Sequence, residues 1–271
     1  MAAPGPVPLR LRALEELGRA SLHALAALGL GAHLLVVSLL WLLLGSRRGQ
    51  TVRPASVFSE MVQIGVRAIP IASLLAGTLG VMLAIQGIYQ LRRFGAEDQV
   101  VIGVAFGMVR EFAPLITGIL VAGRSGSALA ARLATMTISQ EVDALRVMGI
   151  NPVRFLVAPS LFAMLLVLPA LVVWSDLVSL FAAGLYVGGE LGMTLQAFFV
   201  QTLDLLTPDD VMHGVWKSVI FAVLVTLIGI VDGSAVTGGA EGVGRATTNS
   251  VVHGISAIVL TDMLFAFATT R

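Results

Sequence analysis

Hydrophobic residues gather in five long segments of the chain, which short polar connections separate. Because a helix needs about 20 apolar residues to cross the hydrocarbon core of a bilayer, this pattern predicts an all-α membrane protein with about five transmembrane helices. The third segment contains Pro159 and Pro169, so it is either one kinked helix or a broken one. The segments cover roughly residues 64–90, 99–123, 155–187, 211–232 and 250–269.

The N-terminal region, residues 1–50, differs in pattern from the transmembrane domain that we place at residues 51–271. In residues 8–20, leucines alternate with arginine and glutamate, as in an amphipathic helix at a membrane interface. Residues 22–44 are apolar enough either to cross the membrane or to form, with residues 8–20, an elbow in the membrane surface. We therefore expect an N-terminal interfacial elbow helix before the five spans.

Positively charged side chains indicate which side of the membrane each connection occupies, because cytoplasmic loops carry an excess of Lys and Arg. With the start of the first full span inside, the outer segments carry only Arg92, Arg93 and Arg271. This orientation makes residues 194–206 a periplasmic amphipathic helix, and Thr207 with Asp210 predicts a capping box for the next helix. The inner segments carry Arg10, Arg12, Arg19, Arg47, Arg48, Arg53, Arg124, Arg132, Arg146, Arg154 and Arg245.

The connection at residues 135–154 is too polar to span and predicts a short cytoplasmic helix. Thr137 with Gln140 resembles a capping box, while Gly149 is a natural C-terminal cap and Pro152 stops continuation. Such a helix either lies on the membrane surface or docks on a cytoplasmic subunit. Its apolar face consists of Ile138, Val142, Leu145 and Met148.

The composition supports a membrane protein and excludes several other classes. Of the 271 residues, 57% are hydrophobic and 12% charged, with a mean hydropathy of +0.94, whereas soluble domains are about 25% charged. The net charge of +1 argues against a nucleic-acid partner, and the absence of cysteine excludes disulfides and thiol chemistry. The four histidines show no metal-ligand spacing. The glycine-rich residues 233–248 predict a flexible loop, and no ATP-binding P-loop motif occurs.

Among the ionisable residues inside the predicted spans, we single out Arg110, Glu111, Lys217 and Asp262. Each costs about 2.5–3.5 kcal/mol at the centre of a membrane helix, so we expect them to face a protein interior or a wet cavity and to pair with one another. Two are cations and two are anions. The set is either a structural network that fixes helix register or part of a substrate path, and both roles are compatible. Pro114, just beyond, predicts a bend.

Two further patterns have a structural and a functional interpretation each. Small residues recur at helical spacing after Pro114, in one ladder from Gly118 to Ala134 and another from Gly123 to Ala131. They allow close helix packing within the chain or self-association. On the first span, an apolar stripe either packs internally or provides a flexible lining for acyl chains. This stripe and the polar residues beyond it are Leu75, Leu79, Met82, Gln86 and Tyr89.

Four motifs together resemble the permease subunit of the MlaE/YrbE family, over about residues 55–271. They read REFAPLITGILVAGRSGSALAARLATM, EVDALRVMGINPVRFLVAP, KSVIFA and GGAEGVGRATTNSVV. The resemblance implies a homodimeric permease of a lipid transporter in the bacterial inner membrane, which moves phospholipids between inner and outer membranes. It implies a cytoplasmic ABC ATPase dimer that uses ATP and Mg²⁺, with no cofactor in this chain, a periplasmic ring of MCE-domain proteins and often a STAS-domain protein.

The resemblance also implies roles for particular residues. The family's charged membrane residues match Arg110, Glu111, Lys217 and Asp262, and its lipid-contacting first span matches the region of Gln86 and Tyr89. Arg132 departs from the family, whose members tend to carry an acidic residue there. A proton- or ion-coupled secondary transporter and a non-transporting scaffold for lipid-binding partners are the alternatives. The coupling helix that contacts the ATPase matches Thr137–Ile150, with Ile138, Glu141, Val142, Leu145, Met148 and Gly149.

Overall fold

The computed structural model describes residues 18, 22, 25–26, 29–41 and 53–269. In this part of the chain all regular structure is helical, and five helical runs are long and apolar enough to cross a membrane, as the sequence predicts. Two runs are single helices, α10 (Pro208–Ser234) and α11 (Gly239–Thr269). The others combine several elements: α2 (Pro54–Ile64), η1 (Val66–Ala68) and α3 (Ile69–Arg92); α4 (Val100–Phe106), η3 (Gly107–Phe112), α5 (Ala113–Val121), η4 (Ala122–Gly126) and α6 (Ser127–Ile138); η5 (Val153–Val157) and α8 (Ala158–Leu191).

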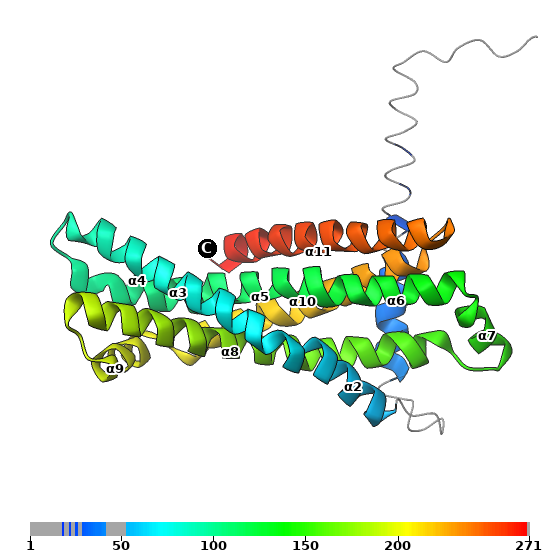
Figure 1. Ribbon diagram of the computed structural model, residues 1–271, viewed down its shortest axis with the longest axis horizontal. Helices are drawn as coiled ribbons and strands as arrows, with labels where there is room; N and C mark the ends of the chain where they lie inside the picture. The colour runs from blue at the N-terminus through cyan, green and yellow to red at the C-terminus, as the bar shows by residue number, and fades with distance from the viewer. Residues whose placement is uncertain (1–17, 19–21, 23–24, 27–28, 42–52, 270–271) are drawn as a thin grey trace, which may run out of the picture.

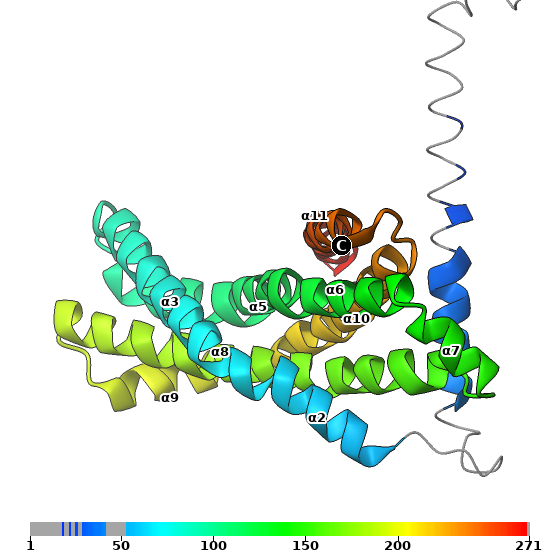
Figure 2. The ribbon, with the colours of Figure 1, turned by 45° about the vertical axis from the view of Figure 1, so that its right-hand side comes forward.

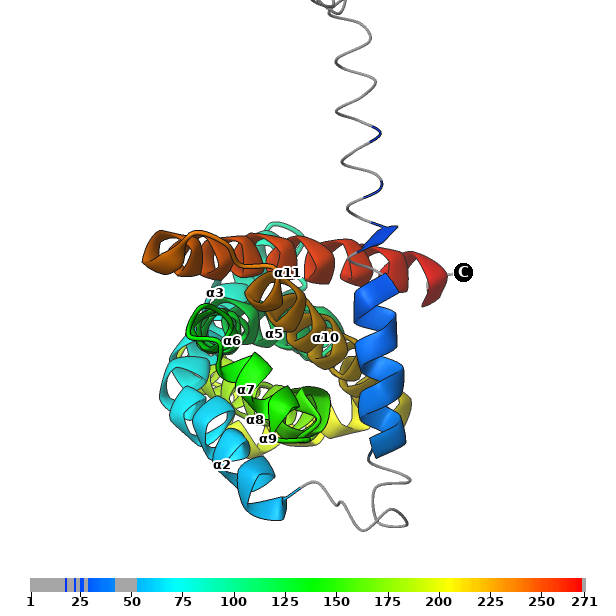
Figure 3. The same cartoon turned by 90° about the vertical axis from the view of Figure 1, so that its right-hand side faces the viewer.

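The helices lie side by side in an elongated bundle (Figure 1). Two short helices, α7 (Glu141–Val147) and α9 (Leu195–Leu205), lie at opposite ends of it. The excess of arginine on the α7 side predicts that this end is cytoplasmic. α8 is the central helix, since 61% of the most apolar stretch of its run is buried, against 11% for α11. α11 therefore runs along the outside of the bundle, as the view from the α7 end shows (Figure 3).

The described helix of the N-terminal region, Gly29–Trp41, lies beside the α7 end of the bundle (Figure 2). Leu34 packs there against Leu129 and Leu133 of α6. The described part of this helix covers fewer than the roughly 20 residues that a full span requires. Most of the amphipathic stretch predicted at 8–20 lies outside the described residues.

Each of three prolines is the second residue of an α-helix that directly follows an irregular helical turn. Pro70 follows the 3₁₀ turn η1, while Pro114 and Pro159 follow the wider π-type turns η3 and η5. A proline lacks a donor N–H and clashes with the carbonyl four residues earlier, so an irregular turn accommodates it without ending the run. The third predicted segment is accordingly one helix, with Pro169 inside α8.

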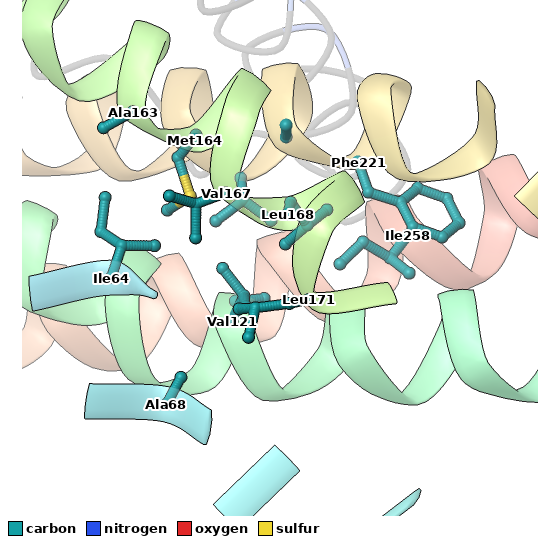
Figure 4. Close-up of a cluster of buried hydrophobic side chains, with 13 residues drawn as sticks. Ile64, Ala68, Val121, Ala163, Met164, Val167, Leu168, Leu171, Phe221 and Ile258 are labelled. Carbon is teal, nitrogen blue, oxygen red and sulfur yellow. The ribbon is translucent and has the colours of Figure 1, made fainter. Parts of the chain in front are cut away.

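A shared apolar core joins α2, α5, α8, α10 and α11 (Figure 4). Leu168 and Leu171 of α8 occupy its middle, with Phe221 of α10 and Ile258 of α11 at one side. Ile64 and Ala68 close the opposite side from the α2–α3 junction. The bundle is thus organised around α8 and not around a central channel within the single chain.

The first small-residue ladder packs within the chain. A Cβ added to Gly118 would lie 2.9 Å from the ring of Phe221, and one added to Gly126 would lie 2.8 Å from Val225. Ala122 faces Gly254 of α11. The packing interpretation is therefore confirmed for these positions. By contrast, Gly123 of the second ladder has open space beside it.

Three boundaries predicted from the sequence are wrong. The second span was expected to end near 123, but its helix continues to Ile138 because the π-type turn η4 bridges the glycines. Most of the glycine-rich segment 233–248 is helical, since α11 already begins at Gly239 after positive φ angles of 89° and 68° at Gly238 and Gly239. The predicted loop is reduced to a tight turn.

The third wrong boundary concerns the short cytoplasmic helix. Ile138 ends α6, and α7 begins only at Glu141 after Gln140 adopts a left-handed φ of 59°. The capping box predicted for Thr137 does not form, because its hydroxyl donates to the carbonyl of Leu133. The C-terminal cap is confirmed: Gly149 has a φ of 73° and donates to Arg146, while Ile150 donates to Leu145.

Candidate functional site

An ionic network joins η3, α10 and α11 inside the bundle. The ammonium of Lys217, on α10, lies 2.5 Å from Glu111 Oε2 and 3.0 Å from Asp262 Oδ1. Lys217 is completely buried, whereas the side chain of Asp262 is 13% exposed and that of Glu111 is 40% exposed. Burying an ammonium is tolerable only with close partners of opposite charge. The two carboxylates provide them from the two neighbouring helices.

Arg110 has a different partner from the one that the sequence suggested. Its Nη1 lies 3.4 Å from Asp210 Oδ1, so Arg110 and Glu111, although adjacent, pair with different residues of α10. Asp210 also accepts from Thr207, and the capping box predicted at the start of α10 is confirmed. One carboxylate therefore both caps α10 and holds the guanidinium of Arg110.

His213 is a member of the site that sequence reasoning missed. Its Nε2 lies 3.9 Å from Glu111 Oε1, and its ring packs edge-on against Phe265 of α11, with centroids 4.8 Å apart. Lys217 also lies 5.7 Å from the centre of the Phe265 ring. The spacing of positions 210, 213 and 217 is the signal that could have found it, because it places all three on one helical face.

The π-type turn η3 explains how the adjacent residues Arg110 and Glu111 reach different partners on α10, Asp210 and Lys217. A π turn adds a residue to the helical turn and shifts the direction of the side chains that follow, and such turns are frequent at functional sites. η3 ends at Phe112, two residues before Pro114, so the same irregular turn also accommodates the proline. One turn therefore both makes room for Pro114 and directs the two charged side chains to their partners.

The network lies off-centre, on the α9 side of the middle of the bundle. Lys217 follows the first residue of α10 by nine positions, roughly 14 Å along a helix. Arg110 and Glu111 remain 38% and 40% exposed at that depth. A half-exposed ion pair facing lipid is strongly unfavourable, so this surface of the single chain requires a protein or aqueous cover.

The residues predicted on the first span lie apart from the network. The buried face of α3 consists of Ala72, Ala76, Gly80, Ala84 and Ile88, which allows close approach to α8. Leu79 packs in the core at the α9 end of the bundle. Met82 and Tyr89 are more than half exposed, and Tyr89 accepts a hydrogen bond from Arg93. No group of three or more potential metal ligands occurs in the described residues.

The predicted coupling residues divide into an inner and an outer set. Leu145 is 8% exposed, and Val142 packs against the cluster that includes Leu133. Met148 is 64% exposed, and the neighbouring Val147, which is not one of the predicted residues, is 89% exposed. Arg132 pairs with Glu60 of α2 at 2.5 Å and donates to the hydroxyl of Ser160 on α8.

Five long apolar helical runs, three of which an ionic network joins, define a multi-pass α-helical membrane protein. The family model described as Permease MlaE matches residues 57–268, and the chain belongs to this family. It is 31% identical over 211 residues to a probable ABC transporter permease protein of Rickettsia prowazekii, covering 77% of this chain and 80% of the relative. It is 30% identical over 206 residues to the intermembrane phospholipid transport system permease protein MlaE of Haemophilus influenzae, covering 76% and 79%. It is also 30% identical over 211 residues to the chloroplastic protein TRIGALACTOSYLDIACYLGLYCEROL 1 of Arabidopsis thaliana, covering 78% and 60%.

Proposed function

We propose that this chain is the membrane subunit of an ATP-driven transporter that moves phospholipids between the inner and outer membranes of a bacterium. The observation that carries the proposal is the half-exposed pair Arg110 and Glu111 at bilayer depth, next to the buried Lys217. Lipid tails do not stabilise such a surface, but a second copy of the chain enclosing a lipid-holding chamber does. The relative named for intermembrane phospholipid transport supports the choice of substrate.

In this proposal the chamber has a charged and an apolar part. Arg110 and Glu111, the exposed members of the charged set that includes the buried Lys217 and the largely buried Asp262, face the lipid headgroup. The outer side of α3, with the partly buried Leu75 and the exposed Met82 and Tyr89, contacts the acyl chains. Met and Leu side chains adapt to chains of varied shape. The chain itself breaks no covalent bond, and a cytoplasmic ABC ATPase dimer supplies the energy with ATP and Mg²⁺. An MCE-domain ring and a STAS-domain protein complete the proposed assembly.

Reconstitution tests this proposal against the ion-coupled transporter. The chain, with its partner ATPase in proteoliposomes, should move a fluorescent phospholipid to an acceptor only when hydrolysable ATP and Mg²⁺ are present. Transport by the chain alone, driven by a proton or sodium gradient, would contradict the proposal. If the chain were a non-transporting scaffold, no lipid should lie between two copies. Lipid density at a twofold interface would therefore exclude that alternative.

The exposed end of α7 gives a separate prediction for the ATPase contact. Met148→Asp should weaken co-purification of the ATPase at least tenfold, because a charge then replaces an apolar contact in the proposed interface. Leu203→Asp on α9 is the matched control, since Leu203 is similarly exposed, at 72%, on the opposite side of the membrane. Leu145 is unsuitable because it is buried within the chain itself. Unchanged recovery of the ATPase with Met148→Asp would remove α7 from the interface.

A further inference from the structure

A cavity of about 220 Å³ lies between α2, α6 and the start of α8, away from the ionic network. Ile64 and Met164, which lie at one edge of the shared core (Figure 4), form part of its lining. Its walls carry three arginines, Arg67, Arg124 and Arg132. By position along their helices these residues lie toward the α7 end, which is the predicted cytoplasmic end. The cavity is smaller than the roughly 300–1,000 Å³ of sites for drug-sized ligands, and suits one small polar group.

The charges that line this cavity do not balance. Three guanidinium groups face a single carboxylate, that of Glu60, so the lining has a formal excess of two positive charges. Glu60 is held by Arg132, which also donates to the hydroxyl of Ser160 at 3.2 Å. Arg132 is therefore fixed in place and largely neutralised. The excess belongs to the other two arginines.

Arg124 and Arg67 retain free hydrogen-bonding capacity. Arg124 donates through Nη1 to the carbonyls of Gln63 and Ile64, at 3.3 and 3.4 Å, which orients its guanidinium at the end of α2. Within the described part of the chain, Arg67 makes no hydrogen bond or ion pair. Arg67 is also exposed, just after the break at Gly65. One oriented guanidinium and one unpaired guanidinium thus border the same small space.

We propose that this cavity binds a phosphate group, with Arg124 and Arg67 as its principal ligands. Guanidinium forks match the tetrahedral oxygens of phosphate and bind them through paired, charge-assisted hydrogen bonds. Basic pockets between membrane helices on the cytoplasmic side bind phospholipid headgroups. The phosphate comes from a cytoplasmic-leaflet lipid or from free phosphate. The site goes beyond the proposed function, because it is separate from the network of Lys217 and lies at the opposite end of the helices.

A probe within the cavity tests this directly. Ala128 lines the cavity at an exposed position. Because the chain contains no cysteine, the variant Ala128→Cys provides a single site for labelling with bimane. The experiment uses the full-length protein in detergent. Three ligands are titrated: dioctanoyl phosphatidylglycerol, dioctanoylglycerol without phosphate, and inorganic phosphate. We expect a saturable fluorescence change with phosphatidylglycerol and none with dioctanoylglycerol. Saturation by inorganic phosphate at lower concentration than by the lipid identifies free phosphate as the source.

Arginine variants connect the signal to the proposed ligands. Arg67→Gln should raise the Kd of the phosphate-bearing ligand about tenfold, since it removes charge-assisted hydrogen bonds to the anion. Arg53→Gln is the matched control, because Arg53 is exposed at the other end of α2 and does not line the cavity. An unchanged Kd with Arg67→Gln, or equal binding of dioctanoylglycerol, overturns the proposal. Transport assays with the unlabelled complex report separately on the proposed function. If the bimane fluorescence does not change with any ligand while the complex still transports lipid with ATP, only the phosphate site is refuted.

Discussion

Lys217→Met is expected to lower the stability of the permease by about 3 kcal/mol and to abolish lipid transport. Methionine fills a similar volume but leaves Glu111 and Asp262 as neighbouring carboxylates without a cation, 2.5 and 3.0 Å from where the ammonium lay. Removing one partner of a buried ion pair costs about 3–5 kcal/mol, because the remaining charge is uncompensated. Thermal unfolding of the purified chain in nanodiscs measures the first effect, and the proteoliposome assay measures the second.

A neutral triple variant separates the two interpretations of the network. Lys217→Met with Glu111→Gln and Asp262→Asn removes all three charges, so much of the lost stability should return. If transport also returns, the network only fixes helix register. If stability returns without transport, the charges act on the substrate path. Arg92→Met is the control, since its ion pair with Glu190 is half exposed and should contribute about 1 kcal/mol or less. A Lys217→Met protein as stable as the parent would contradict the ionic assignment.

The partnership of Glu111, Lys217 and Asp262 was predictable from the sequence, because charges at bilayer depth must find one another. The partner of Arg110 was not. Asp210 was interpreted only as a helix cap, since its polar neighbours place it at the end of a span, yet one carboxylate accepts from both Thr207 and Arg110. Hydrophobicity alone does not reveal such shared use of a side chain. Spacing along α10 carried the information, through the common face of Asp210, His213 and Lys217.

Five spans were predictable from the sequence because each requires its own apolar stretch, but their ends were less so. Glycine and proline usually mark helix termini, whereas here they lie within continuous runs. The π-type turns η3 and η4 absorb the irregularity at Pro114 and around Gly123. The amphipathic pattern at 138–148 likewise predicted that one helical face is covered, but it did not indicate whether this chain or a partner covers it. Leu145 is covered by this chain, and Met148 remains exposed.

Gly229→Val should strongly disrupt the packing of α10 against η4 and the start of α6. A Cβ at Gly229 would lie 2.8 Å from the carbonyl oxygen of Gly126 and 3.6 Å from Leu129. Because the nearest atom belongs to a helical backbone, it cannot rotate away as a flexible side chain would. Overpacking of this kind typically costs about 1–3 kcal/mol and occasionally more, and small residues are what allow membrane helices to approach so closely. We expect a loss of about 3 kcal/mol in unfolding free energy, measured in nanodiscs.

Gly123→Val is the matched control for this prediction, because it makes the same change of residue type in a helical run where a Cβ meets nothing within 4 Å. The control has a second use. Gly123 belongs to the second small-residue ladder, whose role in self-association the single chain leaves open. The oligomeric state of the Gly123→Val variant should therefore be measured together with its unfolding free energy. A control that unfolds normally but no longer forms dimers places the second ladder at the interface between two copies. Equal destabilisation by both substitutions would instead show that loss of glycine, and not the contact of α10 with η4 and α6, is responsible.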